Sequence, residues 1–186
     1  MTIVEVFADV RCPFTHVGLR KLVERREAEG IDLVLRVRAW PLELVNGRPL
    51  DADLISEEVG QLKRTVAPNL FARFDPRGFP QSSLPALSLA AAAYEQDLRT
   101  GERVSLLLRD ALYEEGRDIS QPEELARIAD QAGMLASGTL SEASRAWAST
   151  GPWRRLSLSS AFGERAGSWL PSWMRLCRHH HRCSGD

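Results

Sequence analysis

The chain has 186 residues, of which 44% are hydrophobic and 26% are charged. This ordinary globular mix argues against a disordered chain, and the length suits one domain or one domain that carries a large insertion. The net charge of −1 gives no electrostatic basis for a nucleic-acid or anionic-membrane partner. The longest weakly polar run, Leu84 to Tyr94, contains Pro85 and Ser88 and is far shorter than the about 20 apolar residues that a membrane span needs.

The start of the chain favours a cytoplasmic protein. Residues 2–7 form an apolar, β-branched run without the basic start, apolar core and small-residue cleavage site of a secretory signal peptide. Thiols stay reduced in the cytosol, so a cysteine there is more often chemical than structural. The chain has only three cysteines, Cys12, Cys177 and Cys183, which are too few for a disulfide framework.

Two strands and a helix are predicted within the first 40 residues. Residues 2–8 and 31–40 are rich in β-branched and apolar side chains, and a helix is expected between them at 13–29, with Gly30 as its stop. A strand, a helix and a strand at this spacing form a βαβ unit, so the strands should be parallel with a right-handed crossover. We expect the first strand to be buried on both faces, with these side chains in the core: Ile3, Val4, Val6 and Phe7.

The stretch that follows predicts mainly helices. Residues 41–82 are irregular apart from a helix at 53–66, and Ser120 with Glu123 has the spacing of a capping box. The other expected helices are 84–98, which ends near Gly101, then 102–115, 120–133 and 139–149. We therefore divide the chain into a βαβ segment at 1–45, a helical insertion domain at 46–149 and an atypical C-terminal segment at 150–186.

Cys12 is the most informative residue for chemistry. It follows the first predicted strand directly and stands at the start of the first predicted helix. The unpaired N–H groups and the dipole of a helix N-terminus favour an anion, so we expect the pKa of this thiol to be lowered. A thiol with a lowered pKa is a nucleophile at neutral pH. The alternative is that Cys12 is a buried and chemically inert core residue.

The same segment resembles the DsbA-like branch of the thioredoxin superfamily, which includes 2-hydroxychromene-2-carboxylate isomerases and kappa-class glutathione transferases. Its members show a strand, then Asp-x-x-Cys-Pro-x-Cys, then a helix, and Asp9, Cys12, Pro13 and Phe14 match this pattern. The resemblance extends through residues 38–44 and 83–133 and covers about residues 1–145. It implies an α/β fold with a thioredoxin-like βαβ core and a helical insertion, and an activity in thiol–disulfide exchange.

Thr15 stands where the second cysteine of the family motif would be. Without a second thiol there, Cys12 cannot be released from a mixed disulfide by the local route. Monothiol exchange with a small-molecule thiol or a protein disulfide remains open, as does thiol-assisted isomerisation. We expect the Thr15 hydroxyl to donate a hydrogen bond to the sulfur. The isomerases and kappa-class transferases carry a serine in place of the first cysteine, which this chain does not have.

The C-terminal residues depart from the family pattern. Members of the family carry a Gly-x-Pro-like loop with a cis-proline and two further strands, and nothing in residues 145–186 matches these well. We therefore expect an incomplete sheet, and we hypothesise that the reading frame departs from the ancestral one after about Ala143 to Thr150. The run from Cys177 to Cys183 contains thiols and imidazoles, but its arginines oppose a cation, and we expect a solvated tail and no metal site. A disulfide between these cysteines, or a resolving role for either of them, stays open.

The sequence therefore predicts a DsbA-like thiol oxidoreductase that acts as a monothiol enzyme. Cys12 is the expected nucleophile, and Thr15 is expected to stabilise its thiolate by a hydrogen bond. Pro13, Phe14 and His16 complete the motif, and we expect Phe14 to pack or face a substrate and His16 to be a solvated surface residue. No cofactor is implied beyond a low-molecular-weight thiol. The alternatives are a non-catalytic, degenerate thioredoxin-fold protein and a small-thiol-dependent isomerase or transferase.

Overall fold

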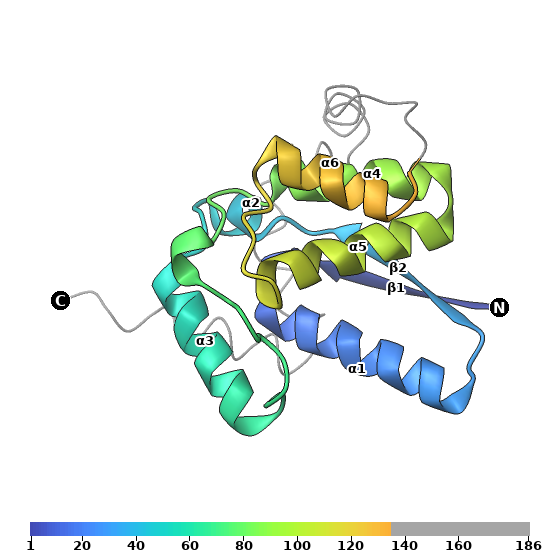
Figure 1. Ribbon diagram of the computed structural model, residues 1–186, viewed down its shortest axis with the longest axis horizontal. Helices are drawn as coiled ribbons and strands as arrows, with labels where there is room; N and C mark the ends of the chain where they lie inside the picture. The colour runs from blue at the N-terminus through green and yellow to red at the C-terminus, as the bar shows by residue number, and fades with distance from the viewer. Residues whose placement is uncertain (135–186) are drawn as a thin grey trace, which may run out of the picture. The chain divides into compact units, whose positions relative to one another are not determined.

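A computed structural model of the chain describes residues 1–134 (Figure 1). Strand β1 (Thr2–Ala8) and strand β2 (Leu33–Ala39) pair in parallel, in a register that sets Thr2 opposite Leu33 and Ala8 opposite Ala39. Helix α1 (Pro13–Glu29) connects them and ends at Gly30, whose left-handed φ of 61° lets its N–H bond the carbonyl oxygens at the helix end. The predicted βαβ unit is confirmed.

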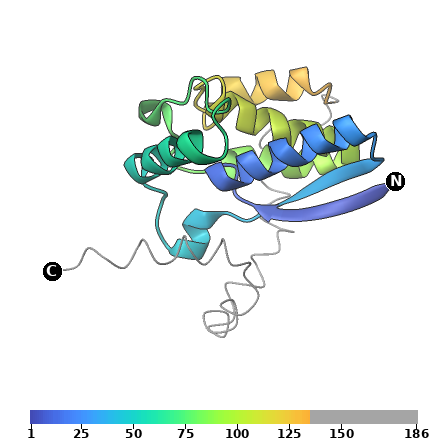
Figure 2. The same ribbon diagram turned by 90° about the horizontal axis from the view of Figure 1, so that it is seen from below.

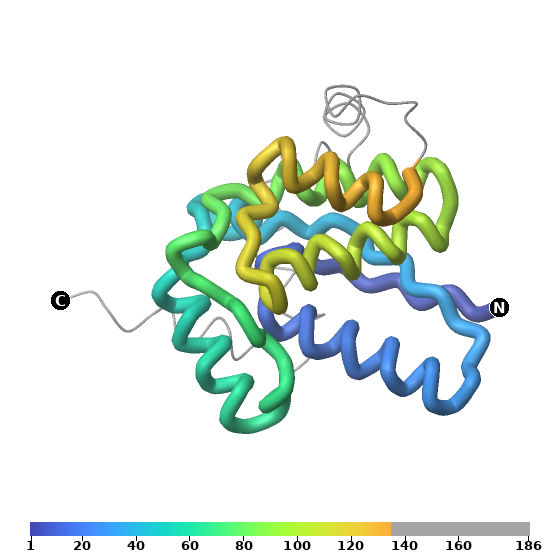
Figure 3. Tube along the Cα trace, in the orientation of Figure 1, coloured from blue at the N-terminus to red at the C-terminus, as the bar shows by residue number. Residues whose placement is uncertain are grey.

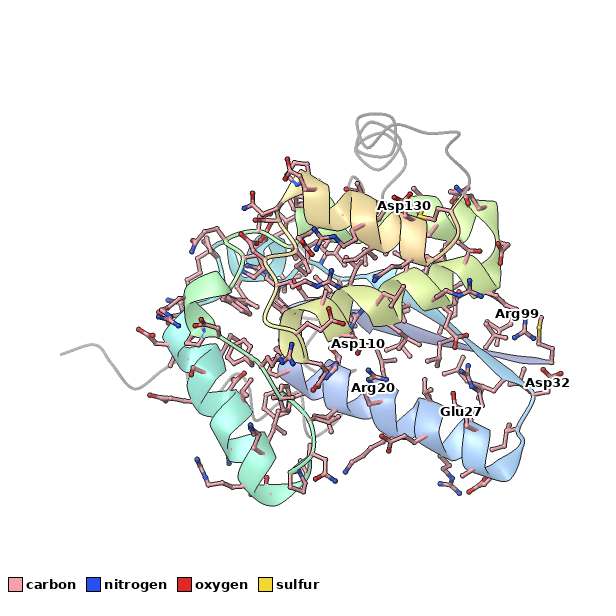
Figure 4. All side chains as sticks on the ribbon, viewed as in Figure 1. Arg20, Glu27, Asp32, Arg99, Asp110 and Asp130 are labelled. Carbon is pink, nitrogen blue, oxygen red and sulfur yellow. The ribbon has the colours of Figure 1, made fainter. Side chains whose placement is uncertain are left out.

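Helices α1, α4, α5 and α6 lie to one side of the two strands (Figure 2). The N-terminal end of α1 lies beside α3 in every view of the chain trace (Figures 1 to 3). Further along α1, Arg20 pairs with Asp110 of α5 at 2.5 Å (Figure 4). The bounds of the remaining elements are α2 Leu42–Asn46, α3 Ala52–Thr65, the 3-10 turn Pro76–Gly78, α4 Leu84–Gln96, α5 Leu98–Tyr113 and α6 Pro122–Gln131.

Strand β1 is not buried on both faces, which corrects the sequence-based expectation. The side chains of Val4 and Val6 are partly buried in a small apolar cluster with α1. The side chains of Ile3 and Phe7 alternate with them and are 43% and 52% exposed. The reason is the period of two along a strand: within the described residues the helices pack on one face of the sheet, so alternate side chains point away from them.

The break between α4 and α5 falls at Asp97 and not near Gly101. Asp97 ends α4, and its carboxylate accepts the N–H groups of Arg99 and Thr100, each at 2.9 Å, so that it also caps α5. Gly101 lies inside α5, where a Cβ atom would collide with the ring of Tyr94. This glycine therefore serves close packing between helices and does not stop one.

The predicted capping box at Ser120 is also wrong. Helix α6 begins at Pro122 with Gln121 as its N-cap, and no side chain caps it. The Ser120 backbone N–H and hydroxyl instead bond Asp118 at 2.9 and 2.7 Å in the preceding turn. An aspartate two residues earlier competes for the serine, and this local pairing prevails over the helix cap. The predicted helix at 139–149, the proposed frame change, Cys177 and Cys183 all lie outside the described residues.

The outer edge of β2 is covered by side chains of the helices. The Tyr94 hydroxyl accepts the N–H of Val37 at 2.9 Å and donates to the carbonyl oxygen of Leu35 at 3.1 Å. Glu102 accepts the N–H of Leu35 at 2.9 Å and pairs with Arg26. These bonds replace some of those that a further strand would make, so the N–H groups of Leu35 and Val37 and the carbonyl oxygen of Leu35 are paired although β2 forms an edge within residues 1–134.

Replacing Tyr94 by phenylalanine should therefore destabilise the fold. The ring packing stays, but the N–H of Val37 and the carbonyl oxygen of Leu35 lose their partner, which costs about 1–3 kcal/mol for a buried polar group. Urea unfolding measures the loss, and amide exchange of Val37 should accelerate. Glu95→Gln, on an exposed neighbour, is the matched control, and equal stability of the two variants would contradict this role of Tyr94.

Candidate active site

Cys12 is the N-cap of α1, with an extended backbone at φ −84° and ψ 113°, and Pro13 occupies the first helical position. Its N–H donates to the Asp9 carbonyl oxygen at 3.3 Å, and its own carbonyl oxygen accepts the N–H of His16 at 3.2 Å. Pro13 has no N–H to leave unpaired at this position. The thiol is partly exposed, at the place where the sequence predicts it.

The surroundings of this thiol reverse one expectation. Burial raises the pKa of Cys12, and the negative charges of Asp9 and Glu58 raise it further. The backbone N–H and the hydroxyl of Thr15 lower it, but less than burial raises it. The thiol sits at a helix N-terminus as predicted, yet the loss of solvation outweighs what the helix end supplies. The prediction that the pKa of Cys12 is lowered is therefore wrong.

The Thr15 hydroxyl hydrogen-bonds the Cys12 thiol and lowers its pKa, as expected, and it also reaches the backbone of the loop. It donates to the carbonyl oxygen of Cys12 at 2.9 Å and lies 3.4 Å from the carbonyl oxygen of Asp9. The hydroxyl is thus shared between the thiol and the loop backbone, and the Thr15 N–H lowers the pKa of the thiol more than the hydroxyl does. Thr15 is buried, and it closes the first turn of α1 around Cys12. Phe14 is partly buried against the main apolar core, so its packing role is in place.

Asp9 anchors the loop that carries Cys12. Its side chain is buried, with Oδ1 accepting the N–H of Arg11 at 2.8 Å. Its Oδ2 accepts the N–H of Leu42 at 2.7 Å and the hydroxyl of Ser83 at 3.0 Å. A buried carboxylate only accepts hydrogen bonds, so it is tolerated because three donors converge on it. Asp9 thereby ties the loop to the starts of α2 and α4.

Arg11 is fully buried, and the sequence patterns did not single it out. Its guanidinium pairs with Glu43 at 2.5 Å and donates to the carbonyl oxygens of Pro80 and Gln81 at 3.2 and 3.0 Å. Its own carbonyl oxygen accepts the hydroxyl of Tyr113. An arginine beside a predicted active-site cysteine would usually be assigned to solvent, and only the folded chain reveals the acceptors that surround it.

A second buried guanidinium, Arg109 of α5, lies beneath the loop. It donates to the carbonyl oxygens of Ser105 at 2.8 Å and Asp9 at 3.3 Å. Burial lowers the pKa of Arg109, whereas the negative charges available at Asp9, Tyr113 and Cys12 raise it. An arginine stays protonated even so, and its positive charge interacts with the Cys12 sulfur.

His16 is buried, which corrects the expectation of a solvated surface histidine. Its ring contacts those of Phe71 and Tyr113, at centroid distances of 5.3 and 4.9 Å. Its Nε2 lies 2.7 Å from a carboxylate oxygen of Glu114, and since a carboxylate only accepts, Nε2 carries the proton. His16 is therefore engaged in the core through Glu114 and the aromatic rings.

Glu114 holds an unusual backbone turn. It accepts the N–H groups of Phe71 and Ala72 at 2.9 and 3.0 Å, and Phe71 has a φ of 63°, which a residue with a side chain rarely adopts. Burial alone would raise the pKa of Glu114, but the bonds from His16, Phe71 and Ala72 outweigh it and hold this pKa at about 2. The ionised carboxylate therefore joins α1, α5 and the loop before the 3-10 turn.

Glu114→Gln should lower the free energy of unfolding by about 2 kcal/mol at pH 7, because buried bonds to a charged group are replaced by weaker ones. The folded-state pKa is depressed, so this stabilisation is complete above about pH 4.5 and is lost as the pH falls toward 2. Denaturant unfolding from pH 7 to pH 3 should show the two proteins converging. Glu115→Gln, on an exposed neighbour, should change stability little, and a constant gap across the pH range would exclude the proposed ionic origin.

Among the described residues there is no candidate metal site and no candidate membrane-spanning helix. Residues 1–134 contain no group of three or more histidine, cysteine, aspartate or glutamate side chains placed to hold a metal ion. None of the helices described has the length and apolar character to cross a membrane.

Comparison with known proteins connects this arrangement to a family. The family model of the DSBA-like thioredoxin domain matches residues 3–148. The chain belongs to this family. The match spans the βαβ unit, the Cys12 loop and the helices, so a thioredoxin-like α/β fold with an added helical layer is confirmed. Within residues 1–134 the sheet has two strands.

Solved structures agree on the fold. The chain is similar to the cytosolic disulfide reductase DsbM from Pseudomonas aeruginosa, with 18% identity and a TM-score of 0.60 over 82% of this chain and 73% of that one. A second structure of DsbM, with GSH, matches at 19% identity and a TM-score of 0.58, covering 82% and 74% of the two chains. No curated protein matches the chain significantly.

The raised pKa of Cys12 can be measured directly. In the full chain with Cys177→Ser and Cys183→Ser, the rate of alkylation by iodoacetamide should rise with pH through a pKa above that of an ordinary cysteine, because burial and two carboxylates oppose the thiolate. A short cysteine peptide measured in parallel gives the unperturbed value. A Cys12 pKa below that of the peptide would restore the expectation that the helix N-terminus dominates.

Proposed function

We propose that the chain is a monothiol thiol–disulfide oxidoreductase with Cys12 as the nucleophile. The observation that carries the proposal is the position of Cys12 at the N-cap of α1, inside the matched DSBA-like domain, with Thr15 one helical turn further on. Membership in this family supports thiol–disulfide chemistry. The threonine supports the monothiol form, since the described loop offers no second thiol to resolve a mixed disulfide.

The reaction would run in two exchanges. The Cys12 thiolate attacks one sulfur of a disulfide, forms a mixed disulfide with that half, and releases the other half as a thiolate that takes up a proton. A small thiol then attacks the substrate sulfur of the mixed disulfide and releases Cys12. We propose glutathione as this small thiol, because the similar DsbM has a structure with GSH. We also propose a cytosolic location, which the cytosolic DsbM supports.

The buried surroundings of Cys12 also suit a second candidate, a non-catalytic member of the family. Burial raises the pKa of Cys12, so the resting chain holds little thiolate at neutral pH. Arg109 argues for the enzyme, because a buried guanidinium near the sulfur favours the thiolate that an inert cysteine would not need. No comparable observation favours the isomerase or transferase alternative.

The deciding experiment uses the full chain with Cys177→Ser and Cys183→Ser, so that Cys12 is the only thiol. Glutathione-dependent reduction of a small disulfide and of a protein–glutathione mixed disulfide should be catalysed, and mass spectrometry should detect Cys12 bound to glutathione during turnover. Cys12→Ser, which changes one atom at a partly exposed site, should fold and be inactive. Activity no higher than that of the serine variant would favour the non-catalytic candidate.

Thr15→Cys tests whether the scaffold still supports dithiol chemistry. Cys12 is the N-cap and Thr15 lies three residues into the same turn, with its hydroxyl 2.9 Å from the Cys12 carbonyl oxygen, so a thiol there lies close enough to close a disulfide. We expect this variant to form a disulfide between Cys12 and the introduced thiol and to reduce disulfides with dithiothreitol as the electron source. Thr15→Ser is the control, and a variant that forms no disulfide would show that the loop no longer suits dithiol exchange.

A further inference from the structure

Glu58 of α3 is a carboxyl group that the sequence patterns did not single out. It lies three residues after Ile55 and four before Leu62, both of which are buried, so it is on the face of α3 that turns toward the core. Its neighbour Glu57 is exposed and points away. The described residues offer the Glu58 carboxylate neither a hydrogen bond nor an ion pair, although the group is half-buried.

The position of α3 brings this carboxylate to the active-site loop. Helix α3 packs against α1, and the N-terminal end of α1, where Cys12 stands, lies beside α3 (Figures 1 and 3). Val59 shares one apolar cluster with Val10 of the loop and Val17 of α1. The negative charge of Glu58 raises the pKa of the Cys12 thiol.

Within residues 1–134, four charged or titratable groups interact electrostatically with Cys12. Asp9 comes from the loop itself, Arg109 and Tyr113 come from α5, and Glu58 comes from α3. Asp9 and Arg109 are engaged in hydrogen bonds with the surrounding chain, and Tyr113 donates its proton to a backbone carbonyl oxygen. Glu58 is therefore the group among the four whose proton site is free to exchange.

Glu58 also titrates in the range that a proton carrier needs. Burial raises the pKa of Glu58 to about 7. A general acid or base works best when its pKa is near the operating pH, because both of its protonation states are then populated. A thiol whose own pKa is raised by burial, as that of Cys12 is, needs such an acceptor to form its thiolate.

We propose that Glu58 carries the proton of Cys12 during thiol–disulfide exchange. This inference rests on the proposed monothiol function. In the first exchange, the Glu58 carboxylate takes the Cys12 proton, the thiolate attacks the disulfide, and the protonated Glu58 returns the proton to the departing thiolate. In the second, Glu58 takes the proton of the small thiol, which attacks the mixed disulfide, and then protonates the Cys12 thiolate as it leaves. The proton is returned in each exchange, and the only redox change is the exchange of disulfide for thiol.

Two measurements on Glu58→Gln in the Cys177→Ser, Cys183→Ser chain separate this role from a purely electrostatic one. The first is release of glutathione from the Cys12–glutathione mixed disulfide by added glutathione, followed from pH 5 to pH 9 and expressed per attacking thiolate. The wild type should show an inflection near pH 7, above which the rate falls as Glu58 loses its proton. Glu58→Gln should be about tenfold slower at pH 6 and lack the inflection. Glu57→Gln, on the exposed face of the same helix, should behave like the wild type.

The second measurement is the pKa of Cys12 from iodoacetamide alkylation. Glu58→Gln should lower this pKa, because it removes a negative charge that raises it. A lowered pKa with unchanged release kinetics would mean that Glu58 acts through its charge alone and would overturn the proton-carrier role. No change in either measurement would overturn it as well. A wild type that forms no mixed disulfide would overturn the proposed function and this inference together, whereas exchange that is indifferent to Glu58 would overturn this inference only.

Discussion

The active-site loop depends on the buried carboxylate of Asp9. A carboxylate removed from water must find donors, and Asp9 finds them in the loop at Arg11, at Leu42 where α2 begins and at Ser83 before α4. These donors come from segments far apart in the chain, so the loop acquires its shape only when the helices have packed. The geometry around Cys12 is therefore a property of the whole described unit, and the helical layer is part of the candidate active site.

Two physical effects compete at the Cys12 sulfur. The N-terminus of α1 and the Arg109 guanidinium favour the thiolate, whereas burial and the carboxylates of Asp9 and Glu58 oppose it. Burial is the largest of these effects, so the resting thiol is protonated. A protonated thiol is a poor nucleophile, so the proposed exchange needs an acceptor for this proton. In the proposed mechanism the helical layer supplies both part of this burial and the carboxylate of Glu58 that accepts the proton.

Much of the βαβ unit could be predicted from local patterns. Pro13 and Gly30 bound α1 as expected, because proline suits a first helical turn and glycine tolerates a left-handed stop. Local patterns fail where a distant partner decides the outcome. They predict a helix stop at Gly101 because the ring of Tyr94, which requires a glycine there, is invisible in the sequence. They assign His16 to solvent because neither Glu114 nor the flanking aromatic rings adjoin it along the chain.

By itself, the sequence determined that a cysteine stands between a strand and a helix in a βαβ unit, that a threonine occupies the place of a second cysteine, and which family these residues resemble. Those properties depend on neighbours within one helical turn or on strand periodicity. The tertiary structure decided the protonation of the thiol, the burial of Arg11 and Arg109, and the approach of Glu58 to Cys12. The solvation of an atom and the charges that act on it depend on which groups surround it in space. Around the Cys12 sulfur, helices within residues 52–113 provide groups that lie far from Cys12 along the chain.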